Sequence, residues 1–557
     1  SCQSMNADAL LDALDEEQRR AAESLVGPTC ILAGAGTGKT RTITHRIAYG
    51  IAKGYYSANR VLALTYTNRA AGELRSRLRS LGASGVQVKT FHAAALAQLE
   101  HFWPQFAGVP APQVVESKAK LIAQAATSLS MKVDTVAVRE LAAEIEWRKY
   151  SLKSLDEYAK QGRPKVSGLT LEQNLAIQEA YETAKVKSQK LDWEDVLILT
   201  VGLLRAEPLA LSHVQQRYRF FTVDEYQDIS PLQHELLDLW LGDHSDLCVV
   251  GDPNQTIYSF TGASSEYLYN FASRYNDASV FELTQNYRSS KQIVTAANRV
   301  VSDSALISPL RSVGDMGNPV QILSFATQQE EVKSIANEIK YQLESGVKAS
   351  DIAVLYRVNG QSEPIEKALA DAGIEYQLRG GERFFNRPEI QRAMTAIKAE
   401  ANSASRPDKS TFELVSDICR SVGWTSREPD HAGPERERWD SLSALLAMVD
   451  ELPEGSTIAD FATELEERKR SQHEPLKASV TLSTIHAAKG LEWSSVFVIG
   501  LTEGYLPIVY ASKPEEIAEE KRLFYVAITR AKRNLVLSWS KSDGRNREPS
   551  RFLSLLA

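Results

Sequence analysis

Ala33-Gly34-Ala35-Gly36-Thr37-Gly38-Lys39-Thr40 follows an apolar run, Thr29–Leu32, and leads into a stretch compatible with a helix. Glycines in such a run let backbone N–H groups approach a phosphate closely. Lys39 can then reach the β- and γ-phosphates, and the Thr40 hydroxyl can bind Mg²⁺. The N-terminal end of the following helix favours the same anion. The run predicts a phosphate-binding loop and a nucleotide hydrolase, although Ala33 stands where the common pattern has glycine.

Length and composition indicate a globular protein of several domains. With 557 residues, 43% of them hydrophobic and 24% charged, three or four domains are expected. No apolar stretch approaches the roughly 18 residues that span a bilayer, and no signal peptide is evident. Met5 is expected to start the natural protein. The four cysteines show no paired spacing, which predicts a reducing cytoplasm and no zinc site: Cys2, Cys30, Cys248 and Cys419.

The overall charge leaves the question of nucleic-acid binding open. The net charge is −7 and the pI is about 5.9, whereas a nucleic-acid-binding domain is often basic. A basic groove can nevertheless exist within an acidic protein.

Short apolar runs alternate with helical stretches twice along the chain, which predicts an α/β fold with two parallel sheets. The first set of expected strands is Cys30–Leu32, Val61–Leu64, Val86–Val88, Phe220–Val223, Cys248–Val250 and Val280–Leu283. The second set is Val320–Phe325, Ile352–Tyr356, Val480–Leu482, Val496–Ile499 and Leu535–Trp539. Each set is interrupted by a helical block. The expected domains are residues 1–100 with 206–285, an insertion at 101–205, residues 286–390 with 479–557, and a second insertion at 391–478.

Two carboxylates follow the strand predicted at Phe220–Val223. Asp224 offers the hard oxygen ligand that Mg²⁺ prefers, and Glu225 is placed to deprotonate an attacking water. A solvated acidic turn is the alternative interpretation. The preceding phosphate-binding loop and the hydrophobic strand favour the catalytic one.

The next strand leads into Gly251-Asp252-Pro253-Asn254-Gln255, followed by two aromatic residues. Gln255 is a candidate sensor of the γ-phosphate. Tyr258 and Phe260 are candidates for stacking on bases, because the preceding turn favours exposure. The alternative is that both rings belong to the core.

Two arginines in the second half are candidate arginine fingers, Arg288 and Arg530. A guanidinium on the γ-phosphate is worth roughly 10³–10⁵ in rate. A surface salt bridge is the ordinary role of a single arginine, so this assignment depends on the resemblance below.

Taken together, the motifs resemble those of the superfamily 1A DNA helicases of the UvrD/Rep/PcrA type, almost from end to end. Alanine at the first position of the phosphate-binding loop is normal in that family. The motifs that carry the resemblance are Leu14–Gln18, Ala33–Thr40, Ala63–Ala71, Thr90–His92, Val223–Asp228, Val249–Ala263, Gln285–Ser289, Tyr356–Ser362, Gly380–Phe385, Thr484–Glu492 and Leu523–Lys532.

The resemblance implies ATP hydrolysis between two RecA-like domains and 3′ to 5′ movement along single-stranded DNA. For the ATP site it implies that Gln18 reads the adenine edge, that Arg41 and Tyr287 sandwich the ring, and that Glu492 lies near the ribose. Phosphates and Mg²⁺ are then held by Gly36, Gly38, Lys39, Thr40 and Asp224, with Glu225 as the general base. The implied contacts to the γ-phosphate are Gln255, Arg288 and Arg530.

For the DNA track the resemblance implies a row of aromatic and polar side chains, with His486 linking the track to the nucleotide site. The implied track residues are Tyr66, His92, Tyr258, Phe260, Arg357, Asn359 and His486. The implied partners are single-stranded DNA, 3′-tailed duplex DNA and a repair or loading protein. The implied setting is a bacterial cytoplasm, with a monomer as the expected state.

Four features depart from the family pattern. Phe260 replaces a stacking tryptophan, Thr261 replaces an arginine, Pro253 replaces an acidic residue, and the second insertion is short. The motor residues are present while the residues expected to grip a duplex are reduced.

Two helicase-class functions therefore remain, beside a kinase-like phosphotransferase that would not need the second α/β domain. The first is an ATP-dependent 3′–5′ DNA helicase in repair or replication. The other is a single-strand translocase that displaces proteins and unwinds poorly without a partner.

Overall fold

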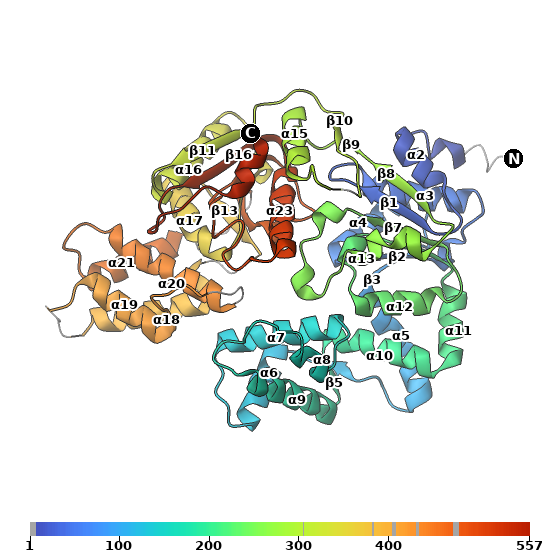
Figure 1. Cartoon of the computed structure of the whole chain (residues 1–557), viewed down its shortest axis with the longest axis horizontal. Helices are drawn as coiled ribbons and strands as arrows, with labels where there is room; N and C mark the ends of the chain where they lie inside the picture. The colour runs from blue at the N-terminus through green and yellow to red at the C-terminus, as the bar shows by residue number, and fades with distance from the viewer. Residues whose placement is uncertain (1–6, 305, 381–383, 404–407, 430–433, 472–477) are drawn as a thin grey trace. The chain divides into compact units, whose positions relative to one another are not determined.

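The computed structural model describes residues 7–304, 306–380, 384–403, 408–429, 434–471 and 478–557 (Figure 1). Within it the chain forms two compact units. The first unit comprises residues 1–287 and 303–313, and the second comprises residues 288–302 and 314–557. The finer division into four domains with two insertions remains a prediction.

The first unit contains a parallel six-stranded sheet in the order β3-β2-β6-β7-β1-β8. β1, β2 and β7 are buried along their whole length, because helices cover both faces of the sheet. The strands are β1 (Thr29–Ala33), β2 (Val61–Thr65), β3 (Gln87–Thr90), β6 (Phe220–Val223), β7 (Leu247–Gly251) and β8 (Ser279–Leu283). All six expected strands are confirmed.

Helices in the first unit build two cores on the sheet and a third core of their own. Alternate residues of β1 and β2 enter separate clusters: Leu32 and Leu62 lie in one, and Ile31 and Ala63 in the other. The helices are α2 (Glu16–Glu23), α3 (Lys39–Ala52), α4 (Asn68–Ser80), α5 (Phe91–Ala107), α6 (Lys118–Ser128), α7 (Thr135–Tyr150), α8 (Leu155–Ala159), α9 (Leu171–Ser188), α10 (Trp193–Ala206), α11 (Pro208–Arg217), α12 (Pro231–Leu241), α13 (Glu266–Tyr269) and α14 (Phe271–Arg274). α6, α7 and α9 pack around their own apolar cluster.

The second unit contains another parallel six-stranded sheet, in the order β11-β16-β15-β12-β14-β13. Its strands are β11 (Gln321–Phe325), β12 (Ile352–Tyr356), β13 (Tyr376–Arg379), β14 (Val480–Thr484), β15 (Trp493–Val498) and β16 (Ala531–Ser540). β13 was not predicted. It is a four-residue edge strand with polar residues at alternate positions, so it lacks the continuous apolar run that marks the buried strands. The predicted fold class, α/β with two parallel sheets, is confirmed.

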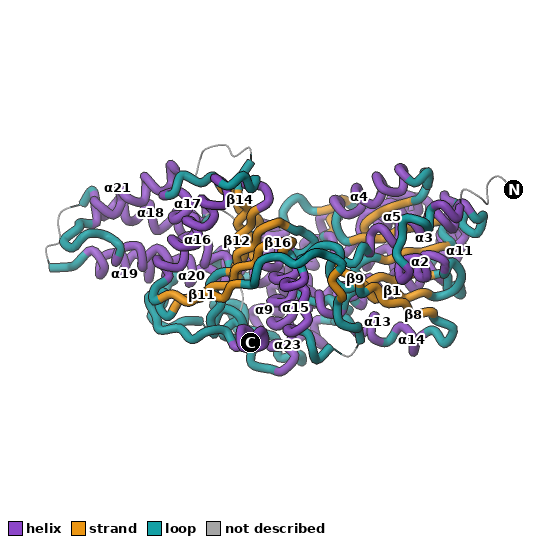
Figure 2. The backbone as a smooth tube through the Cα atoms, turned by 90° about the horizontal axis from the view of Figure 1, so that it is seen from above, coloured by secondary structure: helices purple, strands orange, loops and turns teal. Residues whose placement is uncertain are grey.

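The helices of the second unit are α15 (Lys291–Val300), α16 (Gln328–Glu344), α17 (Ser362–Asp371), α18 (Pro388–Ala401), α19 (Thr411–Val422), α20 (Pro434–Asp450), α21 (Ile458–Ser471), α22 (Ile485–Ala488) and α23 (Pro514–Thr529). Figure 2 shows α18–α21 as a helical group beside the strands of this sheet. Phe384 and Phe385, which precede α18, are buried in the apolar core of that group. The last element described is a 3₁₀ helix, Arg551–Leu556.

In the part of the chain that the structure describes, no helix on its own has the length and apolar composition to cross a membrane. The bent pair α10 and α11 meets those two criteria only when taken together.

Candidate nucleotide and nucleic-acid site

The phosphate-binding loop joins β1 to α3 and is built around two left-handed glycines. Gly36 has φ 66° and Gly38 has φ 76°, which favour glycine. At Gly38 a Cβ would also lie 2.6 Å from Nε2 of Gln18. That amide is buried and donates to the Thr37 carbonyl at 2.9 Å, so α2 closes against the loop.

Lys39, at the first turn of α3, reaches the two carboxylates at the end of β6. Its Nζ lies 3.3 Å from Oδ1 of Asp224 and forms an ion pair with Glu225. Burial alone would lower the pKa of Lys39, but the charges of Asp224 and Glu225 outweigh it and raise the pKa above its usual value. The ammonium is therefore held charged at the mouth of the loop.

Asp224 and Glu225 are positioned by the backbone at the strand end. The Asp224 N–H donates to the Leu64 carbonyl of β2 at 3.0 Å, and the Glu225 N–H donates to Oδ1 of Asp224 at 2.8 Å. Glu225 has φ 52°, an uncommon left-handed conformation for a residue other than glycine. Such backbone conformations cluster at functional sites.

Gln227 is a positioning residue that the sequence analysis missed. Its fully buried amide donates to Oε2 of Glu225 at 2.5 Å and accepts the Asp252 N–H at 3.1 Å. A Cβ at Gly251 would lie 2.8 Å from the same amide oxygen, so the end of β7 approaches it closely. Gln227 thus links the end of β6, where Asp224 and Glu225 lie, to the end of β7, which leads into Gln255.

Gln255 is oriented by Asp252, since its Nε2 donates to Oδ2 at 2.8 Å. The Asn254 N–H donates to the other oxygen of Asp252 at 2.9 Å. Burial raises the pKa of Asp252 to about 6, despite these two hydrogen bonds, which lower it. The carboxyl group of Asp252 therefore serves as a buried anchor for the side chain of the candidate sensor.

The donor set matches what Mg²⁺ would need. The Thr40 hydroxyl, at the start of α3, and the Asp224 carboxylate are hard oxygen ligands on the two elements that meet at Lys39. Burial raises the pKa of Asp224, while Lys39 lowers it. A divalent cation would take over that neutralising role. Among the described residues, no group of three or more His, Cys, Asp or Glu is placed to hold a metal ion.

Arg41 and Tyr287 lie near the same loop but are exposed. Arg41 donates to the Ala13 carbonyl at 2.5 Å, and the hydroxyl of Tyr287 donates to Gln285 at 2.9 Å and also contacts Asp15. Tyr287 is 48% exposed, and its N–H donates to the Gly36 carbonyl at 2.9 Å. The ring therefore has a free face beside the phosphate-binding loop.

Gln18 has both ends of its amide engaged in this structure. Its Oε1 accepts the Asp15 N–H at 3.1 Å while Nε2 binds the Thr37 carbonyl. Its implied reading of an adenine edge would require an exchange of one of these partners.

Arg288, Glu492 and Arg530 all belong to the second unit and lie close together there. Arg288 Nε donates to Glu492 at 2.6 Å, and Lys532 Nζ lies 3.3 Å from the other oxygen of the same carboxylate. Burial would raise the pKa of Glu492, but Arg288 and Lys532 outweigh it and lower the pKa. Arg530 is buried and donates to the carbonyls of Val526 and Leu491.

Three of the expected track residues of the first unit line one cavity of about 240 Å³. They are Tyr66 after β2, His92 in the first turn of α5, and Tyr258 after β7. Phe260 is 55% exposed and neighbours Thr261, which lines the cavity and donates to the Tyr258 carbonyl at 2.8 Å. The exposed Phe260 ring is inconsistent with the interpretation of this residue as core.

His92 is flanked by two aromatic residues from other helices, neither of which was singled out in the sequence. The Tyr150 hydroxyl, at the end of α7, lies 2.9 Å from His92 Nε2. Trp193, at the start of α10, meets the His92 ring edge-on at a centroid distance of 5.9 Å and is 52% exposed. Burial lowers the pKa of His92. An exposed tryptophan directly after a helix N-cap, Asp192, was the available signal.

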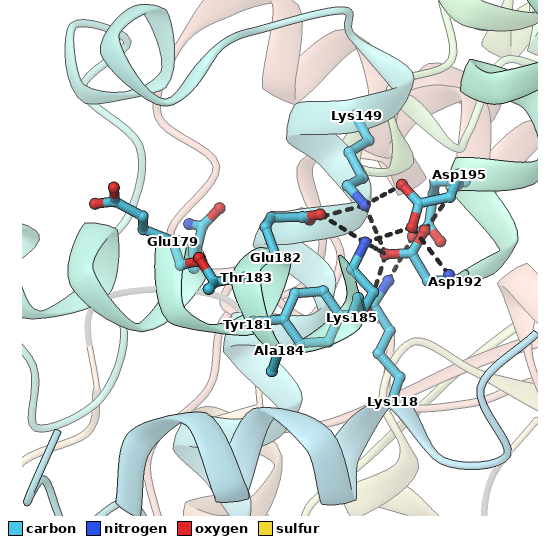
Figure 3. Close-up of polar contacts among 12 residues, drawn as sticks. Lys118, Lys149, Glu179, Tyr181, Glu182, Thr183, Ala184, Lys185, Asp192 and Asp195 are labelled. Atoms are coloured by element: carbon cyan, nitrogen blue, oxygen red, sulfur yellow. Dashed lines mark hydrogen bonds and ion pairs between the residues drawn. The ribbon is translucent and has the colours of Figure 1, made fainter. Parts of the chain in front are cut away.

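The residues that immediately precede these two aromatic residues in the chain, Lys149 and Asp192, belong to a buried ion cluster (Figure 3). Nζ of Lys149 lies 2.7–2.8 Å from the carboxylates of Glu182, Asp192 and Asp195. The ammonium of Lys185 contacts the same three carboxylates. Lys149 precedes Tyr150 and Asp192 precedes Trp193, so the cluster fixes the ends of α7 and α10 relative to α9.

The remaining expected track residues belong to the second unit. Arg357 forms an ion pair with Glu520 at 3.0 Å. Burial alone would lower the pKa of Arg357, but the charge of Glu520 outweighs burial and leaves the pKa raised. The Asn359 carbonyl accepts from Arg387 at 2.7 Å, and His486 lies in α22. Within the motif Gly380–Phe385, residues 381–383 lie outside the described part of the chain.

Comparison with known proteins identifies two matching family models. The UvrD/REP helicase N-terminal domain matches residues 14–276, and the UvrD-like helicase C-terminal domain matches residues 281–429 and 409–542. The chain is 43% identical to the ATP-dependent DNA helicase UvrD2 of Mycobacterium tuberculosis, over all of this chain and 83% of the relative. It is 28% identical to the ATP-dependent DNA helicase PcrA of Staphylococcus aureus, over 98% of this chain and 86% of the relative.

Proposed function

Because the chain belongs to the UvrD/REP family of superfamily 1A and is an ATP-dependent DNA helicase, we propose that it couples hydrolysis of Mg²⁺-bound ATP to 3′–5′ movement on single-stranded DNA. The observation that carries the ATPase part of the proposal is the ion pairing of Lys39 with Asp224 and Glu225 at the end of β6. The direction of movement is what the family resemblance implies. A cation and two carboxylates at a phosphate-binding loop suit a polyphosphate and its metal ion.

In the proposed reaction each polar group of this site has one task. Lys39 exchanges its carboxylate partners for the β- and γ-phosphates. Mg²⁺, held by the Thr40 hydroxyl and Asp224, would neutralise phosphate charge when bound. Glu225, released from Lys39 but still held by Gln227, accepts the proton of the attacking water. Gln255, oriented by Asp252, contacts the γ-phosphate.

We assign Arg288 and Arg530 to the γ-phosphate and Glu492 to the ribose side. Two observations support this assignment: the three residues lie together, and Arg288 pairs with the partly exposed carboxylate of Glu492 while its other side donates to the Thr529 carbonyl. That carboxylate can be exchanged for phosphate oxygens at low cost. Arg530 donates to the carbonyls of Val526 and Leu491 and to the Thr529 hydroxyl, and these bonds orient its guanidinium.

For DNA, we propose that bases stack along the aromatic cavity of the first unit. Tyr66, His92 and Tyr258 line it, and the exposed rings of Phe260 and Trp193 extend it. Base–aromatic stacking is tolerant of sequence, as a motor on single strands requires. Arg357, Asn359 and His486 would continue the track in the second unit.

The alternative, a translocase that unwinds poorly on its own, is favoured by one observation. Thr261 lines the cavity where the family pattern has an arginine, so a cation is missing from the proposed DNA site. Each lost phosphate contact lowers affinity and flattens the salt dependence by about one unit. DNA repair or replication is the proposed setting.

The direct test combines DNA-stimulated ATPase with strand displacement on duplexes carrying either a 3′ or a 5′ tail. The proposal expects ATPase stimulation by single strands and displacement only from the 3′-tailed duplex. Displacement from the 5′ tail would refute the direction. Strong ATPase stimulation with little displacement would select the translocase.

Glu225→Gln tests the chemical assignment. It should retain ATP binding while hydrolysis slows by about 10²–10⁴-fold, the scale of a general base. A rise in KM with unchanged kcat would make Glu225 a binding residue instead.

A further inference from the structure

One carboxylate on the wall of the aromatic cavity has no hydrogen-bond or ion-pair partner within the described part of the chain. Glu146, on α7, lines the cavity beside Tyr150, and no hydrogen bond or ion pair to it occurs among the described residues. The other glutamates of α7 are engaged: Glu144 accepts from Tyr158 and Arg163, and Glu140 accepts from the Ser167 N–H. Glu146 is therefore the glutamate of this helix left facing the cavity.

A second unpartnered polar group lines the same cavity. The hydroxyl of Tyr66 is buried and has no hydrogen-bond partner within the described chain. Buried polar groups are normally hydrogen-bonded, and exceptions call for a specific explanation such as a ligand. Glu146 belongs to a helix of the block between β3 and β6, whereas Tyr66 follows β2, so two separate parts of the fold each bring an unpartnered polar group to one cavity.

The charged groups around Glu146 favour a ligand that presents a charged or strongly polar edge to the cavity. Burial raises the pKa of Glu146, and the neighbouring Glu194 raises it further, while Lys118 lowers it. Lys118 is itself engaged with Glu194 at 2.5 Å, so Glu146 is left without a cation of its own. A ligand group that donates hydrogen bonds to Glu146 would offset the unfavourable burial of its charged form.

The two groups together match one pattern of base edge. A carboxylate only accepts hydrogen bonds, whereas a tyrosine hydroxyl both donates and accepts. Adenine and cytosine present an amino group next to a ring nitrogen that accepts. Thymine has no amino group: its one donor on this edge, the N3–H, lies between two carbonyl oxygens that would repel the carboxylate. Acceptance from the cytosine amino group is an established use of Glu.

We propose that Glu146 is a specificity-determining residue of the DNA track: it accepts from the amino group of cytosine or adenine while Tyr66 donates to the adjacent ring nitrogen, so that the cavity disfavours thymine. The inference rests on the proposed function, because it requires a base to enter the cavity. Rings of Tyr258 and His92 supply stacking to any base. Glu146 adds selectivity to a site that would otherwise be indifferent to sequence.

The test measures the concentration of single-stranded DNA that half-activates the ATPase, using 20-nucleotide oligo(dC) and oligo(dT). These two pyrimidine strands stack weakly on themselves, so the comparison isolates the base edge. The wild-type protein is expected to be half-activated by oligo(dC) at a concentration about fivefold lower than by oligo(dT), the scale of one good base contact. Glu146→Ala should bring the ratio near one, and Glu146→Gln should raise the affinity for oligo(dT), since an amide can donate to a thymine carbonyl. Tyr66→Phe, which keeps the ring, should reduce the ratio without abolishing activation.

The matched control is Glu172→Ala, which removes one exposed carboxylate from α9, away from the cavity lining. It should leave both activation constants and the basal ATPase unchanged. An oligo(dC) to oligo(dT) ratio that is the same in wild type and Glu146→Ala overturns the inference while leaving the proposed function in place. Absence of activation by either strand in the wild type refutes the proposed function itself.

Discussion

Replacing Gln227 by alanine should separate the positioning of the general base from the binding of ATP. The change removes the amide that donates to Glu225 at 2.5 Å and accepts the Asp252 N–H at 3.1 Å. It leaves the P-loop, Lys39 and Thr40 intact. The expected result is a lower kcat with a nearly unchanged KM for ATP.

The magnitude follows from the two bonds. A hydrogen bond to a charged group contributes roughly 1.5–3 kcal/mol, and the Glu225 side chain is partly exposed, which places its loss at the lower end. Each 1.36 kcal/mol in the barrier is tenfold in rate, so kcat should fall by about 10–30-fold. The buried Asp252 N–H left without a partner costs a further 1–3 kcal/mol of stability, on the order of the usual penalty.

The assay is steady-state ATPase at saturating single-stranded DNA, with thermal unfolding measured in parallel. Gln227→Glu is the matched variant, because it keeps an oxygen for the Asp252 N–H but places a second carboxylate beside Glu225. Gln227→Glu should be more stable than Gln227→Ala, and its kcat should be as low as that of Gln227→Ala or lower. If Gln227→Ala lowered the melting temperature but left kcat intact, Gln227 would be a packing residue and the reasoning would be refuted.

Three further changes probe the rest of the site. Lys39→Ala should abolish ATP turnover while circular dichroism and single-strand binding stay close to wild type; substantial turnover in a folded variant would contradict its phosphate role. Phe260→Ala should weaken single-strand binding by about 1–3 kcal/mol, the scale of one stacked base, with little change in ATPase measured without DNA; an equal loss of both activities would show that the ring supports the motor itself and not DNA binding. Burial raises the folded pKa of Asp252 to about 6, above its unfolded value of about 3.9, so the wild type should gain stability relative to Asp252→Asn as pH falls from 7 to 5. Melting temperatures that diverge in the opposite direction would show that folding lowers the pKa of this carboxyl.

The sequence predicted the motor sheets well because their strands are continuous apolar runs bounded by helices. β12 was predicted with its observed ends, and β1, β2 and β7 within one or two residues. The edge strand β13 was missed because an edge is half solvated, so its residues Tyr376–Arg379 carry no uninterrupted apolar signal.

The site was predictable only where a short motif carries the chemistry. Lys39, Asp224 and Glu225 lie at fixed positions relative to strand ends, and the structure brings them together. Gln227 and Glu146 could not be found this way. The amide of Gln227 acts through a contact with the end of the neighbouring strand, and Glu146 is distinguished from Glu144 only by what its helix happens to face.

The shared lysines of the buried ion cluster restrict how this protein can be re-engineered. Lys149 lies on α7 and Lys185 on α9, whereas Asp192 is the N-cap of α10 and Asp195 lies in its first turn. Helix α10 also packs against α5 and α12. Removing one partner from a buried ion pair typically costs about 3–5 kcal/mol. A chimera that exchanged α6–α9 for the helices of a relative but kept its own α10 would leave Asp192 and Asp195 without Lys149 and Lys185. The transplantable segment therefore extends through Asp195, and a library built on single substitutions would find almost no tolerated change at these positions.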